Sequence, residues 1–189
     1  KALKSPGQAV DEIIYELFYR IPLTYYNTRN TIGTNVFSRD WDTLILLDTC
    51  RVDALQEVAP EYDFIQKVDS IRSVGGRSPE WVAKTFVEEY EETIQQTAYL
   101  SANVFAEPIL DSESPDASSL ADKSFTYDLL DRIPTVDVDT LGKCEYLFKY
   151  EPVGEEGPIG HKEGGTPPRY VTDRAIDVCR NGEFNRLIL

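Results

Sequence analysis

The feature that most constrains this chain is a short apolar run, Thr43–Leu47, which ends directly at a carboxylate, Asp48. Continuous apolar runs of this length are typical of strands covered on both faces, as in parallel sheets. In open α/β sheets ligands bind outside the carboxyl ends of the strands. A carboxylate at such an end is a good ligand for a divalent metal ion. Asp48 could equally cap the helix that follows, and its position alone leaves both interpretations open.

Strand-like and helix-like segments alternate after this run, which favours an α/β doubly wound sheet. Strands are expected at 43–47, 62–70 and 96–105, with a less distinct one at 144–150. Helices are expected at 51–59, 78–90 and 166–182, and a short one at 125–133. The segment 107–123 is acidic and rich in turn residues, so we expect a surface loop or insertion there. The Gly- and Pro-rich segment 151–168 is also expected to be a loop.

The domain organisation follows from these segments. Residues 1–40 predict an accessory helix, with apolar residues at helical spacing between Ser5 and Pro22, and a lead-in to the main domain. Residues 41–189 predict the N-terminal part of one α/β domain. The apolar run 184–189 is either a short edge strand at a natural terminus or the point at which a longer protein is truncated. We expect the second, because a buried-type strand seldom ends a chain unprotected.

The charge balance excludes several classes of partner. The chain carries 33 acidic and 19 basic residues, for a net charge of −14. This argues against nucleic acid and anionic lipid, both of which require a basic face. The acidity suits a high-salt cytoplasm, where salt screens self-repulsion, although a merely well-solvated surface would have the same composition. No run is long enough to span a membrane and no signal segment is recognisable, so we expect a cytoplasmic protein.

Cysteine and histidine usage limits the metal chemistry. The three cysteines are widely spaced and form no CxxC pair, so neither a disulfide framework nor a cysteine zinc site is expected. Cys144 and Cys179 are expected to be small buried hydrophobes. The single histidine, His161, lies in the glycine-rich loop and cannot form a histidine metal site by itself.

A second cluster with possible chemistry is SIRSVGGRSPEW, residues 70–81. Two glycines precede a helix start, where backbone N–H groups and the helix dipole favour an anion. Ser78 would lie at that positive end beside Arg77. A hydroxyl between a metal and an anion site is what a phosphoryl- or sulfuryl-transfer nucleophile requires. The alternative is an ordinary N-cap serine after a turn.

Taken in order, the segments WDTLILLDTCRVDAL, RSVGGRSPEWVAKTF, TAYLSANVF and TPPRYVTDRAIDVCR…FNRLIL resemble the sulfatase-like branch of the alkaline phosphatase superfamily. The likeness extends from Trp41 onward and is closest to sulfatase-like hydrolases of haloarchaea. It implies an alkaline-phosphatase-like three-layer α/β/α fold with a mainly parallel sheet, incomplete at its C-terminus.

The resemblance also implies residue roles. Asp48 would be a metal ligand, and Ser78 would be the nucleophile that also contacts the metal. The cofactor would be a divalent ion such as Zn²⁺, Mg²⁺, Mn²⁺ or Ca²⁺. The substrate would be a small-molecule, glycan-linked or lipid-linked phosphate or sulfate ester. A role for Arg77 in contacting the transferred anion is inferred from its position alone.

One departure limits the resemblance. Neither Cys50 nor Cys179 begins the Cys-x-Pro-x-Arg motif of formylglycine sulfatases, so the likeness predicts a fold rather than a sulfate substrate. A catalytically silent α/β domain, used for binding or as a scaffold, is the main alternative. A nucleotide-binding Rossmann domain is disfavoured, because the glycines at 75 and 76 lack the G-x-G-x-x-G spacing.

Overall fold

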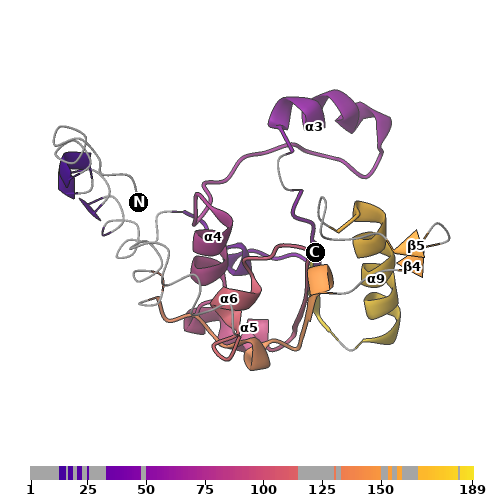
Figure 1. Ribbon diagram of the computed structural model, residues 1–189. Coiled ribbons are helices and arrows are strands. Elements are labelled where there is room, and N and C mark those ends of the chain that lie inside the picture. The colour runs from indigo at the N-terminus through magenta and orange to yellow at the C-terminus, as the bar shows by residue number, and fades with distance from the viewer. Residues whose placement is uncertain are drawn as a thin grey trace.

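The chain folds around a four-stranded parallel sheet (Figure 1). The computed structural model describes residues 13–15, 17–18, 21–22, 25, 33–47, 50–114, 130, 133–149, 153–154, 157–158, 166–182 and 184–189. The sheet order is β1–β6–β2–β3, and its strands are β1 (Thr43–Leu44), β2 (Thr97–Ser101), β3 (Lys143–Tyr146) and β6 (Arg186–Ile188). An α/β fold with a parallel sheet is therefore confirmed.

The centre of the sheet is formed by β2 and β6. All five residues of β2 are buried, as expected for the apolar segment that contains it. Ala98 pairs with Leu187 of β6, and Tyr99 pairs with Cys144 of β3. The last strand, β6, lies between β1 and β2 and is therefore an interior strand. It is not the edge strand that was one of the two interpretations of residues 184–189.

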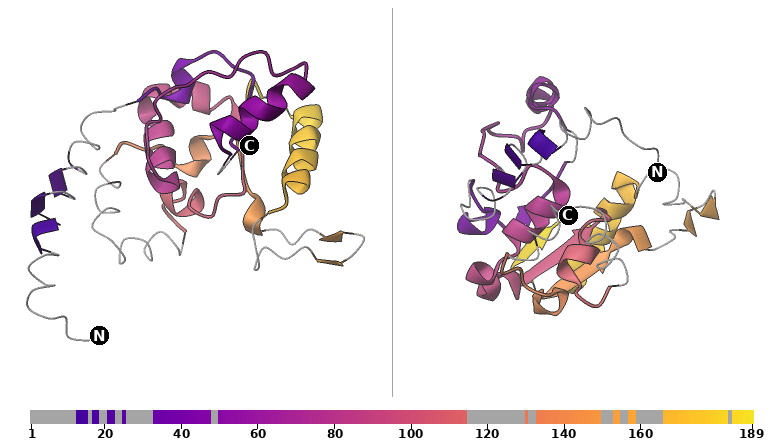
Figure 2. Two further views of the ribbon diagram at one scale, coloured as in Figure 1. Left: turned by 90° about the horizontal axis from the view of Figure 1, so that it is seen from above. Right: turned by 60° about the vertical axis from the view of Figure 1, so that its left-hand side comes forward.

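Helices cover both faces of the sheet (Figure 2). One face carries α4 (Ser78–Thr85), α5 (Glu91–Ile94) and α6 (Glu107–Leu110), and the other carries α9 (Pro168–Asn181). Alternate residues of each strand supply the two cores. Tyr99 and Ile188 face the first core, whereas Ala98 and Leu187 face the second. Completely burying one such large apolar side chain stabilises the fold by about 1.5–3 kcal/mol.

The remaining described elements are short. They are η2 (Val36–Ser38), α3 (Val52–Val58), η3 (Ala59–Glu61), η4 (Glu88–Tyr90), η5 (Val138–Thr140), η6 (Leu147–Lys149) and the antiparallel pair β4 (Val153–Gly154) and β5 (Gly157–Pro158). None of the described helices is both long and apolar enough to cross a membrane.

The structure corrects the expected burial of the first strand. The run 43–47 was expected to be covered on both faces, but only Thr43 and Leu44 pair as a strand, at the edge of the sheet. Ile45, Leu46 and Leu47 are all exposed. The physical reason is that β6 supplies one neighbour and the described chain supplies no second one. The following helix α3 forms where expected, yet none of its residues is buried.

Other expectations fail where a partner or a continuous periodicity is missing. Residues 62–70 form no strand, because no neighbouring strand pairs with them. The helix expected over 78–90 ends at Thr85 and resumes as η4 and α5. Within the expected surface loop, α6 buries Glu107 and Leu110. The expected helix at 125–133 lies mostly outside the described residues.

Two further expectations concern residues near the ends. Helix α9 forms within the expected range 166–182, with Pro167 at its N-cap position and Gly182 at its C-cap position. Cys179 on this helix is exposed, contrary to the expectation of a buried thiol. In the N-terminal segment, the described residues at 13–15 and 21–22 are helical, but their apolar side chains are exposed, so they do not pack against the body as an accessory helix would.

A partly buried ion pair links α9 to the sheet. Arg174 donates two hydrogen bonds to the Glu145 carboxylate, at 2.7 and 2.5 Å. Lys143 adds a third contact at 2.9 Å. The Glu145 side chain is only 8% exposed, so its charge depends on these two cations.

We expect Glu145→Gln to lower the free energy of unfolding by about 1–3 kcal/mol, because it leaves the Arg174 guanidinium without its charged partner. Asp173→Asn is the matched control, since its contact with Arg169 is 3.8 Å and exposed, and should change stability by less than about 0.5 kcal/mol. Urea unfolding measures both, and equal effects would show that the Arg174–Glu145 pair is not what fastens α9.

The same pair predicts a pH dependence. The Arg174 guanidinium, and then Lys143, hold the pKa of Glu145 below its ordinary value of 4.5 despite the opposing effect of burial. A carboxyl whose pKa is lowered by folding stabilises the fold above its unfolded pKa, and this stabilisation is lost as the pH falls through the folded pKa. Unfolding measured from pH 7 downward should therefore show a steeper loss below pH 4.5 in the natural protein than in Glu145→Gln; parallel curves would contradict this assignment.

Candidate active site

The direction of α4 determines where its first residues lie. The Asn35 side-chain amide donates hydrogen bonds of 3.0 Å to the carbonyl oxygens of Lys84 and Thr85, at the C-terminal end of α4. Asn35 precedes β1, so this end of α4 lies near the amino edge of the sheet. The helix therefore runs antiparallel to the strands, and its N-terminus points toward their carboxyl edge (Figure 1), the edge at which α/β folds bind ligands.

Ser78 and Arg77 begin this helix. Arg77 occupies the N-cap position with extended backbone, and Ser78 is the first helical residue, at the start of the expected range 78–90. The Ser78 side chain is half-buried and forms no hydrogen bond with a described residue. Arg77 is exposed and forms no ion pair within the described part of the chain. Both side chains are therefore available to a ligand at the positive end of α4.

The loop before α4 is less open to an anion than the sequence predicted. The Glu80 carboxylate accepts a 2.9 Å hydrogen bond from the Gly76 N–H and pairs with Lys84 at 2.8 Å. The Gly75 N–H donates to the Ser73 hydroxyl at 3.3 Å, and Pro79 has no N–H to offer. The amides of Arg77 and Ser78 remain without a partner among the described residues. An anion would therefore meet these two amides rather than the glycine amides.

Gly75 itself has a packing role. A side chain at this position would collide with the backbone of Trp81 in α4. Only a glycine lets the loop pass this close to the helix, because every other residue carries a Cβ atom. Gly75 therefore permits the close approach of the loop to α4. The backbone N–H of Gly76 is already hydrogen-bonded to the Glu80 carboxylate.

Asp48, the expected metal ligand, lies outside the described residues. On either side of the undescribed residues, Leu47 accepts a 3.2 Å hydrogen bond from the Cys50 N–H. Arg51 pairs with Asp53 at 2.9 and 2.6 Å and lowers the pKa of that carboxyl.

Sequence reasoning assigned no role to Asn103, which follows the buried strand β2 at the same edge. Its side-chain oxygen accepts a 2.9 Å hydrogen bond from the Phe105 N–H. Its backbone N–H donates to the Ser101 hydroxyl at 3.1 Å. The side-chain NH₂ has no partner among the described residues and remains available to a ligand. The signal that could have found it is a polar residue two positions after the end of a strand whose five residues are all buried.

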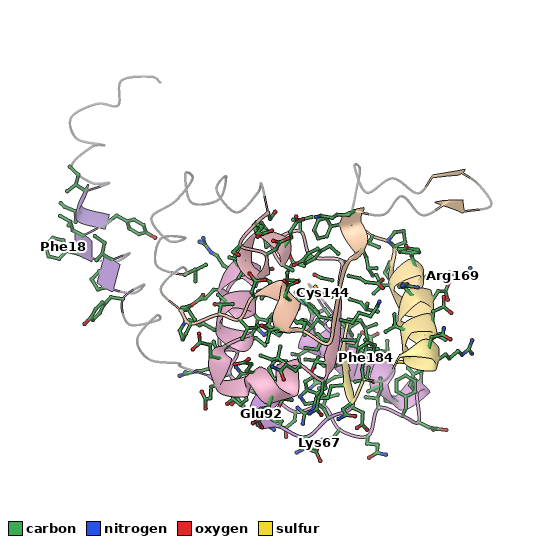
Figure 3. All side chains as sticks on the ribbon, turned by 90° about the horizontal axis from the view of Figure 1, so that it is seen from below. Phe18, Lys67, Glu92, Cys144, Arg169 and Phe184 are labelled. Carbon is green, nitrogen blue, oxygen red and sulfur yellow. The ribbon has the colours of Figure 1, made fainter. Side chains whose placement is uncertain are left out.

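The buried charges near this edge are structural. Glu107 accepts hydrogen bonds from Lys149 at 2.6 Å and from Ser114 at 2.8 Å. The Cys144 thiol lies in the interior (Figure 3), and burial raises its pKa to about 12, so it is no thiolate nucleophile. Among the residues that the structure describes, no three His, Cys, Asp or Glu side chains gather as metal ligands. Asp48 and His161 lie outside the described residues, so this statement does not cover them.

No protein-family model, curated protein or solved structure matches this chain. The case for a function therefore depends on the site itself and on the motif resemblance.

The site should depend on Asn35, because this residue holds the end of α4. We expect Asn35→Ala to lower the free energy of unfolding by about 1–3 kcal/mol, since it removes the donor from two helix-end carbonyls. Asn181→Ala removes a single exposed bond to Asp177 and should cost less than about 0.5 kcal/mol. Chemical denaturation compares the two, and an equally small loss in both would contradict the role of Asn35.

Proposed function

We propose that this chain carries the nucleophile of a metal-dependent hydrolase or transferase for phosphate or sulfate esters, with an alkaline-phosphatase-like three-layer fold. The observation that carries the proposal is the Ser78 hydroxyl. It is half-buried at the N-terminus of an eight-residue helix, has no partner among the described residues, and lies toward the carboxyl edge of a parallel sheet. A serine used only as a helix cap would accept a hydrogen bond from a nearby backbone N–H, and Ser78 accepts none.

In this proposal Ser78 Oγ attacks the phosphorus or sulfur atom of the ester. The hydroxyl proton goes to a base or to solvent, the bond to the leaving alcohol breaks, and the alcohol oxygen takes up a proton. The resulting seryl ester is then cleaved by water or by an acceptor alcohol, which restores the hydroxyl. Arg77 and the amides of Arg77 and Ser78 would bind the non-bridging oxygens as negative charge builds up on them.

The proposed metal would be held by Asp48 and Ser78. Both supply the oxygen donors that hard divalent cations prefer, and the free Ser78 hydroxyl fits this role. The described residues add no further ligand group, and Glu80, in the first turn of the same helix, is engaged by Gly76 and Lys84. When bound, such a metal lowers the pKa of a coordinated hydroxyl.

The alternative is a catalytically silent α/β domain that serves for binding or as a scaffold. It gives Asp48 and Ser78 only local structural roles, so neither side chain would respond to a metal ion. The fold-back of Glu80 over the glycine loop favours this alternative, because it places a negative charge beside the proposed anion site.

Metal-dependent thermal stabilisation distinguishes the two. We expect Mn²⁺ or Zn²⁺ to raise the melting temperature of the natural chain by several degrees, and Asp48→Ala and Ser78→Ala each to lose most of this shift. Asp63→Ala and Ser70→Ala, at exposed positions, are matched controls that should keep it. An equal shift in all five proteins would mean only diffuse binding to the acidic surface.

The role of Ser78 as the nucleophile can be tested separately by measuring the turnover of an ester substrate. With an aryl phosphate or aryl sulfate and the same metal ion, Ser78→Ala should reduce turnover by at least about 1,000-fold. Arg77→Ala should reduce it by about 100-fold, because it loses one charge-stabilising contact. Turnover in Ser78→Ala equal to that of the natural chain would remove Ser78 from the mechanism.

A further inference from the structure

The outer edge of β1 has unpaired backbone groups. β1 is the outermost strand of the sheet, and the hydrogen bonds that join this part of the chain to β6 use Asp42, Leu44 and Leu46. The N–H and carbonyl of Ile45 therefore point outward, and neither is hydrogen-bonded to a described residue. The run 43–47 contains neither a charge nor a proline, the two features that commonly protect an edge strand from pairing.

The helix after β1 has an apolar side without cover. Val52, Leu55 and Val58 recur at helical spacing on one side of α3, whereas Asp53 and Glu57 lie on the other. Val52 is 61% exposed, and no residue of α3 is buried. In Figure 1, α3 and the chain that follows it form an arch above the rest of the domain. An amphipathic helix in this position is expected to place its apolar side on another element.

The segment 62–70, which follows α3, has the composition of a strand but no pairing. Tyr62, Phe64 and Val68 would lie on one side of an extended chain, and Phe64 is 78% exposed. From residue 66 to residue 69, no backbone N–H or carbonyl is hydrogen-bonded to a described residue. Three consecutive parts of the chain thus lack the neighbour that their patterns require.

We propose that residues 62–70 add to the open edge of β1 as a fifth, parallel strand. The connection 48–61 is longer than the about 10–12 residues that a crossover between parallel strands requires. The new pairing supplies the Ile45 N–H and carbonyl with hydrogen-bond partners. The arrangement in Figure 1 is then an open one, which exchanges with this closed one. The proposal does not depend on the chemistry assigned to Ser78.

The handedness of the fold determines where α3 lies in the closed arrangement. The chain passes from β1 inward to β2 with α4 on one face of the sheet, and from β3 back to β6 with α9 on the other. About 98% of such crossovers are right-handed. A step from β1 to a strand outside it has the same direction as the step from β3 to β6, so α3 belongs on the α9 face. Ile45 is directed to that face, because its neighbour Leu44 packs in the opposite core, and α3 would cover it.

Hydrogen exchange of single backbone amides in the full chain, followed by NMR, tests the closure. The Ile45 N–H should exchange at least about 10-fold more slowly than in an unstructured peptide, because the closed arrangement gives it an acceptor. The Leu46 N–H is bonded to Leu189 in the open arrangement and keeps this bond on closure, so it serves as the internal reference. Exchange of the Ile45 N–H at the rate of an unstructured peptide would overturn the proposal.

Proline substitutions identify the segment that protects Ile45. Successive N–H groups of a strand point to opposite sides, so either Gln66→Pro or Lys67→Pro removes a hydrogen bond to β1. At least one of the two should bring the exchange of Ile45 to within about 2-fold of the unstructured rate and leave Leu46 protected. Gln66→Ala and Lys67→Ala keep the N–H and are the matched controls. Unchanged exchange of Ile45 in both proline variants would contradict its pairing with this segment.

The placement of α3 has its own pair of variants. Val52→Asp and Ala54→Asp add the same charge on opposite sides of α3, at positions that are both exposed in the open arrangement. Val52→Asp should speed the exchange of Ile45 at least about 5-fold, because it places a charge between α3 and the sheet, whereas Ala54→Asp should not. An acidic residue in the first turn favours the helix itself. Equal exchange in the two variants would contradict the docking of α3 on the α9 face.

Discussion

The insertion of β6 between β1 and β2 is the constraint on which the rest of the structure depends. Leu189 accepts a 2.7 Å hydrogen bond from the Leu46 N–H and donates one of 3.0 Å to the Leu44 carbonyl, while β2 pairs with the other side of β6. Without this strand, β1 would have no hydrogen-bonded neighbour in the described chain. Because all four strands are parallel, their carboxyl ends meet at one edge. The antiparallel α4 then directs Ser78 toward that same edge.

Electrostatics decides whether this edge can attract an anion. The chain is strongly acidic, so a phosphate or sulfate ester needs a locally positive site. Arg51 is neutralised by Asp53, and Lys84 is neutralised by Glu80. Arg77 and the N-terminus of α4 therefore remain as the positive features nearest to Ser78. A negative Glu80 close by weakens this field, which makes the charge of a bound metal ion important to the proposed chemistry.

The sequence predicted the elements whose signal is local. Strand β2 and helix α9 could be placed from an apolar run and from helical spacing, because both bury the side chains that these patterns specify. The burial of the first strand could not be predicted, since a run such as Thr43–Leu47 has the same composition at an edge as in the centre of a sheet. The segment 62–70 has strand-like residues, but whether a strand forms depends on a partner elsewhere in the fold.

The candidate site likewise contains features that the sequence predicts and features that it does not. Ser78 at a helix start could be predicted from the Ser-Pro-Glu pattern, within one residue. The turn of Glu80 back onto Gly76 could not, although its i,i+4 spacing to Lys84 is visible in the sequence. Asn103 was missed because the sequence does not show which polar side chain after β2 keeps a group without a partner among the described residues. At the site, sequence reasoning therefore lacked the side-chain hydrogen bonds of individual residues, which secondary-structure propensity does not specify.

The central claim is that the Asp48 carboxylate and the Ser78 hydroxyl meet at one metal ion. A crystal structure of the chain soaked with Mn²⁺ and vanadate, with the metal located by anomalous scattering, tests it most directly. The account predicts a manganese peak within about 2.0–2.4 Å of oxygens of both residues, with vanadate bonded to Ser78 Oγ. Manganese bound only at surface carboxylates, with the two side chains on opposite sides of the sheet, would contradict it.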